Sequence, residues 1–174
     1  MILDGTEFFV QKPSDVQDQS ATWSSYKNHS TLKSMIGISP RGVVTHVSQT
    51  YGGCTSDRQI IERSDLIKKG MFEKGDSIMA DRGIMVQDIF ASMDVKVNTP
   101  TMLRGRSQLS SEEVIKDRRI AAKRIHIERV IGLAKTFKIL TGEMHHSLRP
   151  LSDKIIFTCF AMCNFKPCII GEFA

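Results

Sequence analysis

The order of strand-like and helix-like segments along the chain constrains its fold more than any other feature of the sequence. Apolar, β-rich runs lie at residues 1–11, 31–38, 43–48, 77–80 and 95–97. Helical patterns begin after Ser56, at residue 85, after Ser110 and at residue 151. Because strands and helices alternate after the first three runs, the chain is predicted to form an α/β fold, a mixed five-stranded sheet flanked by helices.

Local signals support several of these boundaries. Ser39-Pro40-Arg41-Gly42 joins the second and third runs, with proline and glycine where a β-turn favours them, which predicts a hairpin. Ser56-x-x-Gln59 and Ser110-x-x-Glu113 are capping boxes, so each predicts a helix start. The polar stretch from Lys12 to Ser25 predicts a loop. The last helix is predicted at residues 151–164.

Three carboxylates stand in these elements at well-separated positions. Asp4 lies in the first strand, Asp81 follows the fourth strand 77 residues later, and Glu128 lies in the long helix 47 residues further on. Only a fold can bring them together. The predicted element order is that of a ribonuclease-H-like fold, in which the two strands lie side by side and the helix covers their ends. Oxygen ligands suit Mg²⁺ and Mn²⁺, so the three acids are candidate metal ligands.

Positive charge concentrates around the third acid. The chain has a formal net charge of +5, whereas residues 116–138 alone contain eight basic and two acidic side chains. Arg124, Arg129 and Lys135 are therefore candidate phosphate contacts, which position DNA without selecting its sequence. The alternatives are a solvated helix face and an ion pair between Arg124 and Glu128 one turn apart.

Two further residues are candidates for supporting roles. Asp57 competes for the place of the second carboxylate, but it also follows a helix cap, where an acid favours the helix dipole. His126 adjoins Glu128 and is a packed side chain or a neighbour of the ligands. The four cysteines form no Cys-x-x-Cys pair, which favours buried free thiols over a zinc site.

Length and composition bound the class of protein. A chain of 174 residues with 41% hydrophobic residues is predicted to form a single domain, spanning 1–174, with a sizeable core. Its longest apolar run, 155–163, is shorter than the roughly 20 residues needed to cross a bilayer. The N-terminus lacks the pattern of a secretory signal. We therefore expect a soluble protein that has no membrane contact.

Several motifs occur in an order that resembles the DDE-type transposases of the PIF/Harbinger group. They extend over nearly the whole chain: Asp4-Gly-Thr-Glu, Tyr26-Lys-Asn-His, Gly37-Ile-Ser-Pro-Arg-Gly, Ser56-Asp57, Gly75-Asp76-Ser-Ile-Met-Ala-Asp-Arg-Gly83, Arg124-Ile-His-Ile-Glu-Arg129 and Asn164-Phe165. The resemblance implies a catalytic triad of Asp4, Asp81 and Glu128 that binds two Mg²⁺ or Mn²⁺ ions. It also implies DNA cleavage, transfer of 3′-hydroxyl ends and a location in the nucleus.

The chain departs from this family pattern in two places. Ile84 stands where an aromatic residue is common, and no N-terminal DNA-binding region precedes the first catalytic strand. We therefore expect a catalytic-domain fragment or a decayed copy, acting as a homo-oligomer or with a separate DNA-binding partner. The main alternative is a domesticated module that binds DNA or protein without catalysis. A hydrolase of RNA–DNA hybrids is a third interpretation.

Overall fold

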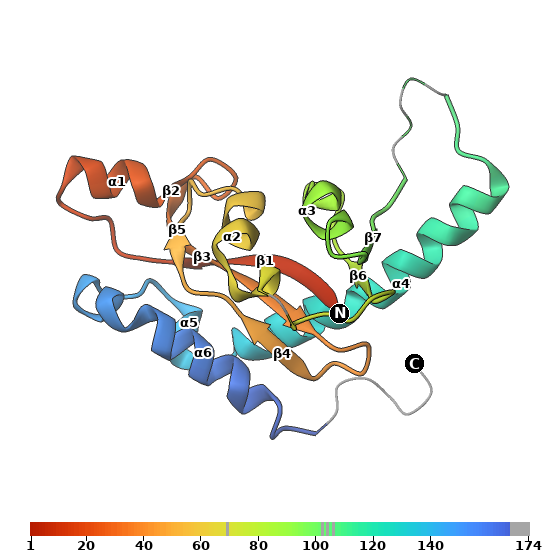
Figure 1. Cartoon of the computed structure of the whole chain (residues 1–174). Helices are drawn as coiled ribbons and strands as arrows, with labels where there is room; N and C mark the ends of the chain where they lie inside the picture. The colour runs from red at the N-terminus through yellow and green to blue at the C-terminus, as the bar shows by residue number, and fades with distance from the viewer. Residues whose placement is uncertain (69, 102, 104, 106, 168–174) are drawn as a thin grey trace.

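The computed structural model describes residues 1–68, 70–101, 103, 105 and 107–167, and its sheet lies between two layers of helices (Figure 1). The strands are β1 (Ile2–Phe9), β2 (Trp23–Ser24), β3 (His29–Ile38), β4 (Val44–Val47), β5 (Tyr51–Gly52), β6 (Ser77–Met79) and β7 (Lys96–Asn98). The helices are α1 (Val16–Thr22), α2 (Asp57–Arg63), α3 (Gln87–Ala91), α4 (Ser111–Ala134), α5 (Lys138–Thr141) and α6 (Ser152–Cys163), with 3₁₀ turns η1 (Asp65–Ile67) and η2 (His146–Leu151).

The strand order is β2-β3-β1-β6-β7, with β4 and β5 also paired to β3. β3 runs antiparallel to β1 and β4, whereas β1, β6 and β7 are parallel to one another. The five strands β4, β3, β1, β6 and β7 have the arrangement of a ribonuclease-H-like sheet, so the predicted fold is confirmed. The two additional strands, β2 and β5, are two residues each and too short to give a sequence pattern.

The predicted turn and capping signals also appear in the structure. In the β3–β4 hairpin, the Gly42 amide donates to the Ser39 carbonyl at 2.9 Å, and Gly42 has the positive φ of 81° that glycine tolerates best. Both capping boxes are formed, at the start of α2 by Ser56 and at the start of α4 by Ser110.

One predicted loop is wrong, because the polar stretch from Lys12 to Ser25 contains helix α1 and strand β2. The Asp15 side chain accepts a hydrogen bond from the Asp18 amide and caps α1. Thr22 is the helix residue that is buried, so α1 lies on the surface and lacks the apolar stripe that would have identified it.

Alternation along the strands divides the core into two clusters. Ile2, Phe8 and Ile36 face α4, α5 and α6, where they pack with Ile127, Val130, Phe160 and their neighbours. Leu3, Met35 and Ile78 face the opposite way, toward α2, η1 and α3. Figure 1 shows these two helical layers below and above the sheet. Along β1, the face toward which a residue points therefore follows from whether its number is odd or even.

Of the cysteines that the structure describes, Cys159 and Cys163 are buried free thiols in α6, as expected, whereas Cys54 is exposed. Burial raises the pKa of both α6 thiols. Cys168 lies outside the described residues. Within the parts of the chain described, no helix combines the length and apolar character needed to cross a membrane.

Candidate active site

The pairing of β1 with β6 brings Asp4 and Asp81 together. Ile2 is the register partner of Met79, and the Met79 amide donates to the Met1 carbonyl at 2.8 Å. Asp4 stands two residues after Ile2, and Asp81 stands two residues after Met79. Because side chains alternate between the two faces of a sheet, Asp4 and Asp81 point to the same face as Ile2 and Met79. The negative charge of Asp81 also raises the pKa of Asp4, which agrees with this placement. Both belong to the face that α4 covers.

Asp4 is poorly solvated at this position. Its pKa is raised from 3.8 to about 6, chiefly by burial and then by the negative charges of Asp81 and, more weakly, Asp57. The Arg124 guanidinium and a hydrogen bond from the Gly5 amide act in the opposite direction and lower this pKa. The carboxyl group of Asp4 is therefore a site where an additional positive charge would be favourable.

Arg124 provides the positive charge that the structure places at this site. Its Nη1 lies 2.8 Å from Asp81 Oδ1, although α4 and the end of β6 are far apart in sequence. Asp81 Oδ1 also accepts a hydrogen bond from the Arg82 amide at 2.7 Å. The buried Nε of Arg124 has no hydrogen-bond partner in the structure. The guanidinium therefore retains a donor after it pairs with Asp81.

Glu128 lies one helical turn after Arg124 on α4 and is exposed. Among the residues that the structure describes, no group of three or more His, Cys, Asp or Glu side chains is arranged to hold a metal ion. The structure thus gathers Asp4 with Asp81, but it does not gather Glu128 with them. The ion pair of Arg124 is with Asp81, and not with Glu128 in the same helix as the alternative interpretation expected.

Asp57 lies on the other side of the sheet. Gly5 is an odd-numbered residue of β1, and a Cβ at Gly5 would lie 2.8 Å from Asp57 Oδ1. Lys33 Nζ lies 3.1 Å from the same oxygen and 3.8 Å from Glu7 Oε1. The contacts of Asp57 are therefore with the Lys33–Glu7 pair, beneath α2, and it stands apart from the face shared by Asp4 and Asp81.

Lys33 is a partner that the sequence analysis did not identify. Glu7 and Lys33 are direct cross-strand partners on β1 and β3, and Thr31 Oγ1 donates to Glu7 Oε2 at 2.9 Å. Opposite charges facing one another across two strands give a recognisable signal once the register of β1 against β3 is known. The register itself was not available from the sequence.

The remaining candidates are distributed along α4. His126 is buried, and desolvation together with the charges of Lys123 and Arg129 lowers its pKa. Arg129 is exposed. Lys135 Nζ donates to the Glu7 carbonyl at 2.9 Å and lies 5.3 Å from the centre of the Phe8 ring. Lys135 is thus held against β1, while Arg129 is presented to solvent.

The Asp4–Asp81 pair suits a hard divalent cation in two respects. It offers carboxylate oxygens, the ligands that Mg²⁺ and Mn²⁺ prefer, and the desolvated carboxylate of Asp4 disfavours an uncompensated charge. Asp4 lies within β1, and Asp81 follows the end of the adjacent parallel strand β6. This arrangement can hold a cation on the face of the sheet that α4 covers, and α4 supplies cationic groups beside it.

A family model described as DDE superfamily endonuclease matches residues 3–164 of the chain. The match begins at the residue before Asp4 and ends in the C-cap of α6, so it contains both carboxylates and the whole of α4. No curated protein and no solved structure gives a significant match to the chain.

Proposed function

Because the chain belongs to the DDE superfamily endonuclease family, we propose that it is the catalytic domain of a metal-dependent DNA endonuclease or transposase of PIF/Harbinger type. The observation that carries this proposal is the β1–β6 register, which sets Asp4 beside Asp81 on the face covered by α4. Proteins of this superfamily act on DNA with divalent metal ions. We further propose the nucleus as the location, and a homo-oligomer or a separate DNA-binding protein as the partner.

The residues that would hold the metal are Asp4 and Asp81, with Glu128 as the proposed third ligand. Asp4 has a neighbouring acid on one side and α4 on the other, so it is the best placed to be shared by two ions. Bound Mg²⁺ or Mn²⁺ supplies positive charge at the attacking and leaving oxygens of a phosphodiester and lowers the pKa of water. Asp4 must be ionised to bind, which links metal affinity to pH.

The cations of α4 complete the site around the carboxylates. Arg124 neutralises Asp81 and is proposed to contact a phosphate oxygen next to the two acids. Arg129 is exposed further along the same helix and is proposed as a second phosphate contact. These groups orient the DNA backbone; sequence selection would need contacts to base edges.

The test is a cleavage assay in Mn²⁺ on a linear DNA duplex and on an RNA–DNA hybrid, with Asp4→Asn, Asp81→Asn and Glu128→Gln as variants. We expect cleavage of DNA by the natural chain, loss of cleavage in all three variants, and little action on the hybrid. Glu73→Gln, an exposed acid before β6 that lies outside the site and the helix, is the matched control. Retained cleavage in the Asp4 and Asp81 variants would contradict the proposed site.

A second candidate function is a DNA- or protein-binding module without catalysis. It is favoured by the exposure of Glu128 away from the Asp4–Asp81 pair and by the occupation of Asp81 by Arg124. Thermal unfolding with and without Mn²⁺ separates the two functions, because a ligand that binds only the native state raises its stability. A shift that disappears in Asp4→Asn supports the enzyme, whereas the absence of any shift in the natural chain supports the binding module.

A further inference from the structure

A groove of about 490 Å³ lies between the sheet and the N-terminal half of α4. Its described lining residues are Met79, Asn98, Glu112, Ile115, Lys116, Arg119, Ile120 and Lys123. Met79 and Asn98 are register partners at the ends of β6 and β7, and the other six residues belong to α4. We call this the β6–α4 groove. None of its residues was a candidate in the sequence analysis.

Two lining residues of the β6–α4 groove are close in sequence to residues of the candidate active site. Met79 stands two residues before Asp81 and points to the same face of the sheet. At the other wall, Lys123 adjoins Arg124, whose guanidinium contacts Asp81. A chain lying in the groove would therefore reach the Asp4–Asp81 pair at one end.

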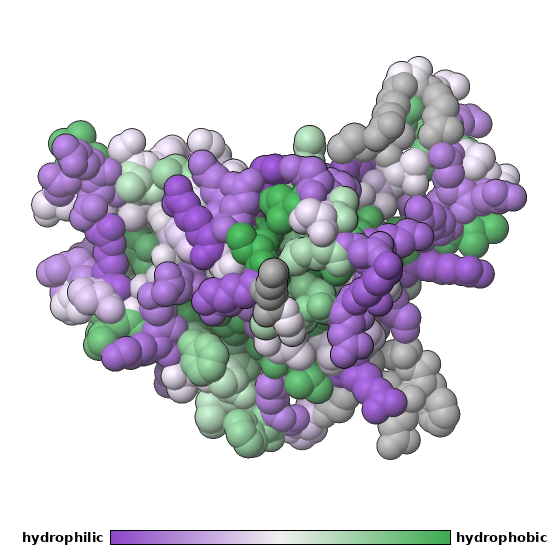
Figure 2. Space-filling model, viewed as in Figure 1, coloured by the Kyte–Doolittle hydropathy of each residue, from purple (hydrophilic) through white to green (hydrophobic). Residues whose placement is uncertain are grey.

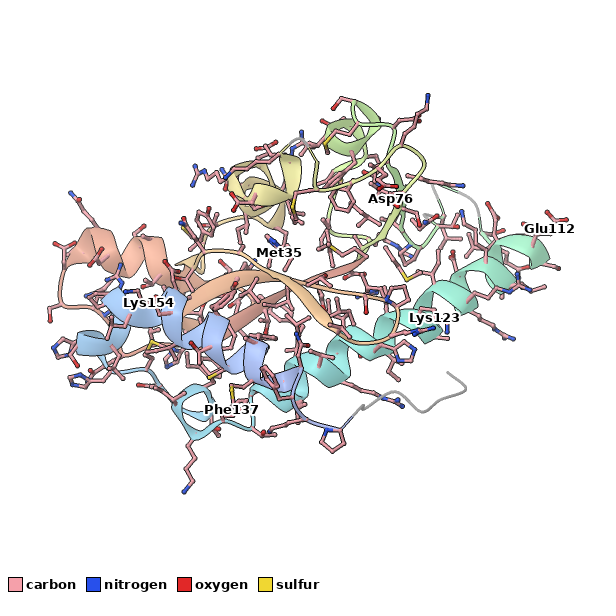
Figure 3. All side chains as sticks on the ribbon, turned by 60° about the horizontal axis from the view of Figure 1, so that its bottom comes forward. Met35, Asp76, Glu112, Lys123, Phe137 and Lys154 are labelled. Atoms are coloured by element: carbon pink, nitrogen blue, oxygen red, sulfur yellow. The ribbon has the colours of Figure 1, made fainter. Side chains whose placement is uncertain are left out.

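The lining of the groove combines an apolar floor with a cationic rim. Ile120 is buried, and Ile115 has 52% of its surface exposed although it is a large aliphatic residue. Lys116, Arg119 and Lys123 are all exposed, against the single acid Glu112. Figure 2 shows hydrophilic side chains gathered over this half of α4, and Figure 3 marks Glu112 and Lys123 near the two ends of the lining.

This combination selects the chemistry of the occupant. Three cations with one acid favour a polyanion, and the aliphatic surface favours flat apolar groups attached to it. In duplex DNA the base faces are stacked inside the helix, so a duplex would use the cations and leave Ile115 in water. Unpaired nucleotides present both phosphates and base faces. Grooves that bind single strands combine cations for the phosphates with apolar surface for the bases. The Asn98 side chain adds an amide that can hydrogen-bond a base edge.

We propose that the β6–α4 groove binds an unpaired DNA segment next to the phosphodiester that enters the active site. From Glu112 to Lys123 the helix rises about 16 Å, so the groove takes a short segment and not a long strand. The proposal rests on the proposed function for the identity of the nucleic acid. It adds that the DNA strand is opened beside the site of cleavage.

The experiment measures binding by fluorescence anisotropy in EDTA, where cleavage cannot occur, to a short single-stranded oligonucleotide and to the matching duplex. The variant is Ile115→Gln, and Ile125→Gln is its control, because Ile125 is also an exposed isoleucine of α4 but does not line the groove. We expect Ile115→Gln to weaken single-strand binding about fivefold or more and duplex binding less than about twofold. Ile125→Gln should change neither.

A second pair of variants tests the cationic rim. Arg119→Gln and Arg118→Gln remove the same charge from neighbouring exposed positions, and only Arg119 lines the groove. Arg119→Gln should weaken single-strand binding more than Arg118→Gln does and reduce the slope of log affinity against log salt by about one. Circular dichroism of each variant confirms that α4 is intact.

An oligonucleotide with abasic sites distinguishes base contact from charge alone. The difference in binding affinity between Ile115→Gln and the natural chain should disappear with the abasic strand. Equal loss for single strand and duplex, equal effects of the two isoleucine variants, or full displacement by an acidic polypeptide would each overturn the proposal. Groove binding without metal-dependent cleavage would overturn the proposed function but not the proposed groove. Metal-dependent cleavage without groove binding would overturn the proposed groove but not the proposed function.

Discussion

Arg124 Nη1 lies 2.8 Å from Asp81 Oδ1, so a helix residue supplies the positive charge beside a carboxylate that a metal ion would also need. The positive charge of the same guanidinium lowers the pKa of Asp4. A cation that binds Asp81 through Oδ1 therefore competes with Arg124 for that oxygen. Metal binding and release of this ion pair are expected to be coupled.

Replacing Arg124 with methionine tests this coupling. Without the guanidinium, the repulsion between Asp4 and Asp81 is no longer offset, so we expect the metal-free protein to unfold at a lower temperature. The rise in Tm produced by Mn²⁺ should be larger than in the natural chain, because the metal meets no competing cation. Arg129→Met, an exposed change on the same helix, should leave both values unaltered. A smaller Mn²⁺ effect in Arg124→Met would show that Arg124 assists metal binding.

Asp4→Asn should change the dependence of stability on pH. The pKa of Asp4 is raised to about 6 in the folded state, above its unfolded value of 3.8, so the folded state binds this proton more tightly. Stability from this group is therefore present below pH 3.8 and is lost as the pH rises through 6. The neutral amide of the Asp4→Asn variant avoids the loss, so in EDTA the variant should be more stable at pH 7.5 by up to about 3 kcal/mol.

The measurement is urea unfolding of both proteins in EDTA at pH 4.5 and pH 7.5. The advantage of Asp4→Asn should shrink at the lower pH, and Glu73→Gln serves as the control for removal of an exposed negative charge. An equal difference at both pH values would show that the raised pKa of Asp4 is not its cause. With saturating Mn²⁺ at pH 7.5 the order should reverse, because the natural chain then gains the binding energy.

Asp57→Asn separates the two faces of the sheet. Asp57 pairs with Lys33 at 3.1 Å on the side of α2, so its neutralisation should lower stability by about 1–2 kcal/mol. The Tm shift produced by Mn²⁺ should remain close to that of the natural chain, because Asp4 and Asp81 are intact. Loss of the Mn²⁺ shift in Asp57→Asn, with the fold preserved by circular dichroism, would make Asp57 a metal ligand.

Lys135→Met tests whether this cation of α4 stabilises the fold or contacts DNA. The ammonium donates to the Glu7 carbonyl and lies over the Phe8 ring, so methionine keeps the aliphatic stem but removes a partly buried hydrogen bond. We expect a loss of about 1 kcal/mol in the free energy of unfolding. DNA affinity should fall less than in Arg129→Met. The opposite ranking, with an unchanged Tm, would assign Lys135 to DNA contact.

Much of the fold followed from local patterns. The hairpin turn, the two capping boxes and the strand before Asp81 depend on residues within a few positions of each other, and the structure contains all of them. Helix α1 could not be predicted from local patterns, because its capping residue Asp15 lies in a polar stretch and its buried surface is limited to Thr22. A helix without an apolar stripe gives almost no periodic signal.

The site was harder to predict, since its members depend on register and helix rotation. The convergence of Asp4 and Asp81 required only the strand order, which the alternation of elements indicates. The assignment of Asp57 to the other face required knowing that Gly5 lies beside it. The choice of Asp81 over Glu128 as the partner of Arg124 required the rotation of α4 about its own axis. Neither quantity is fixed by residue spacing.

The single register contact between Ile2 and Met79 makes tolerance to insertions and deletions uneven along the chain. Between β1 and β6 lie the hairpin, α1 and α2, and a loop there can gain a residue without altering how the two strands meet. Deleting one residue inside β1 before Asp4 would instead turn that carboxylate toward α2 and leave Asp81 alone on the face of α4. Deleting two residues would return the Asp4 carboxylate to the face of α4 but would move it by two residues along the strand. Length variation in this family should therefore collect in the loops and avoid the start of β1.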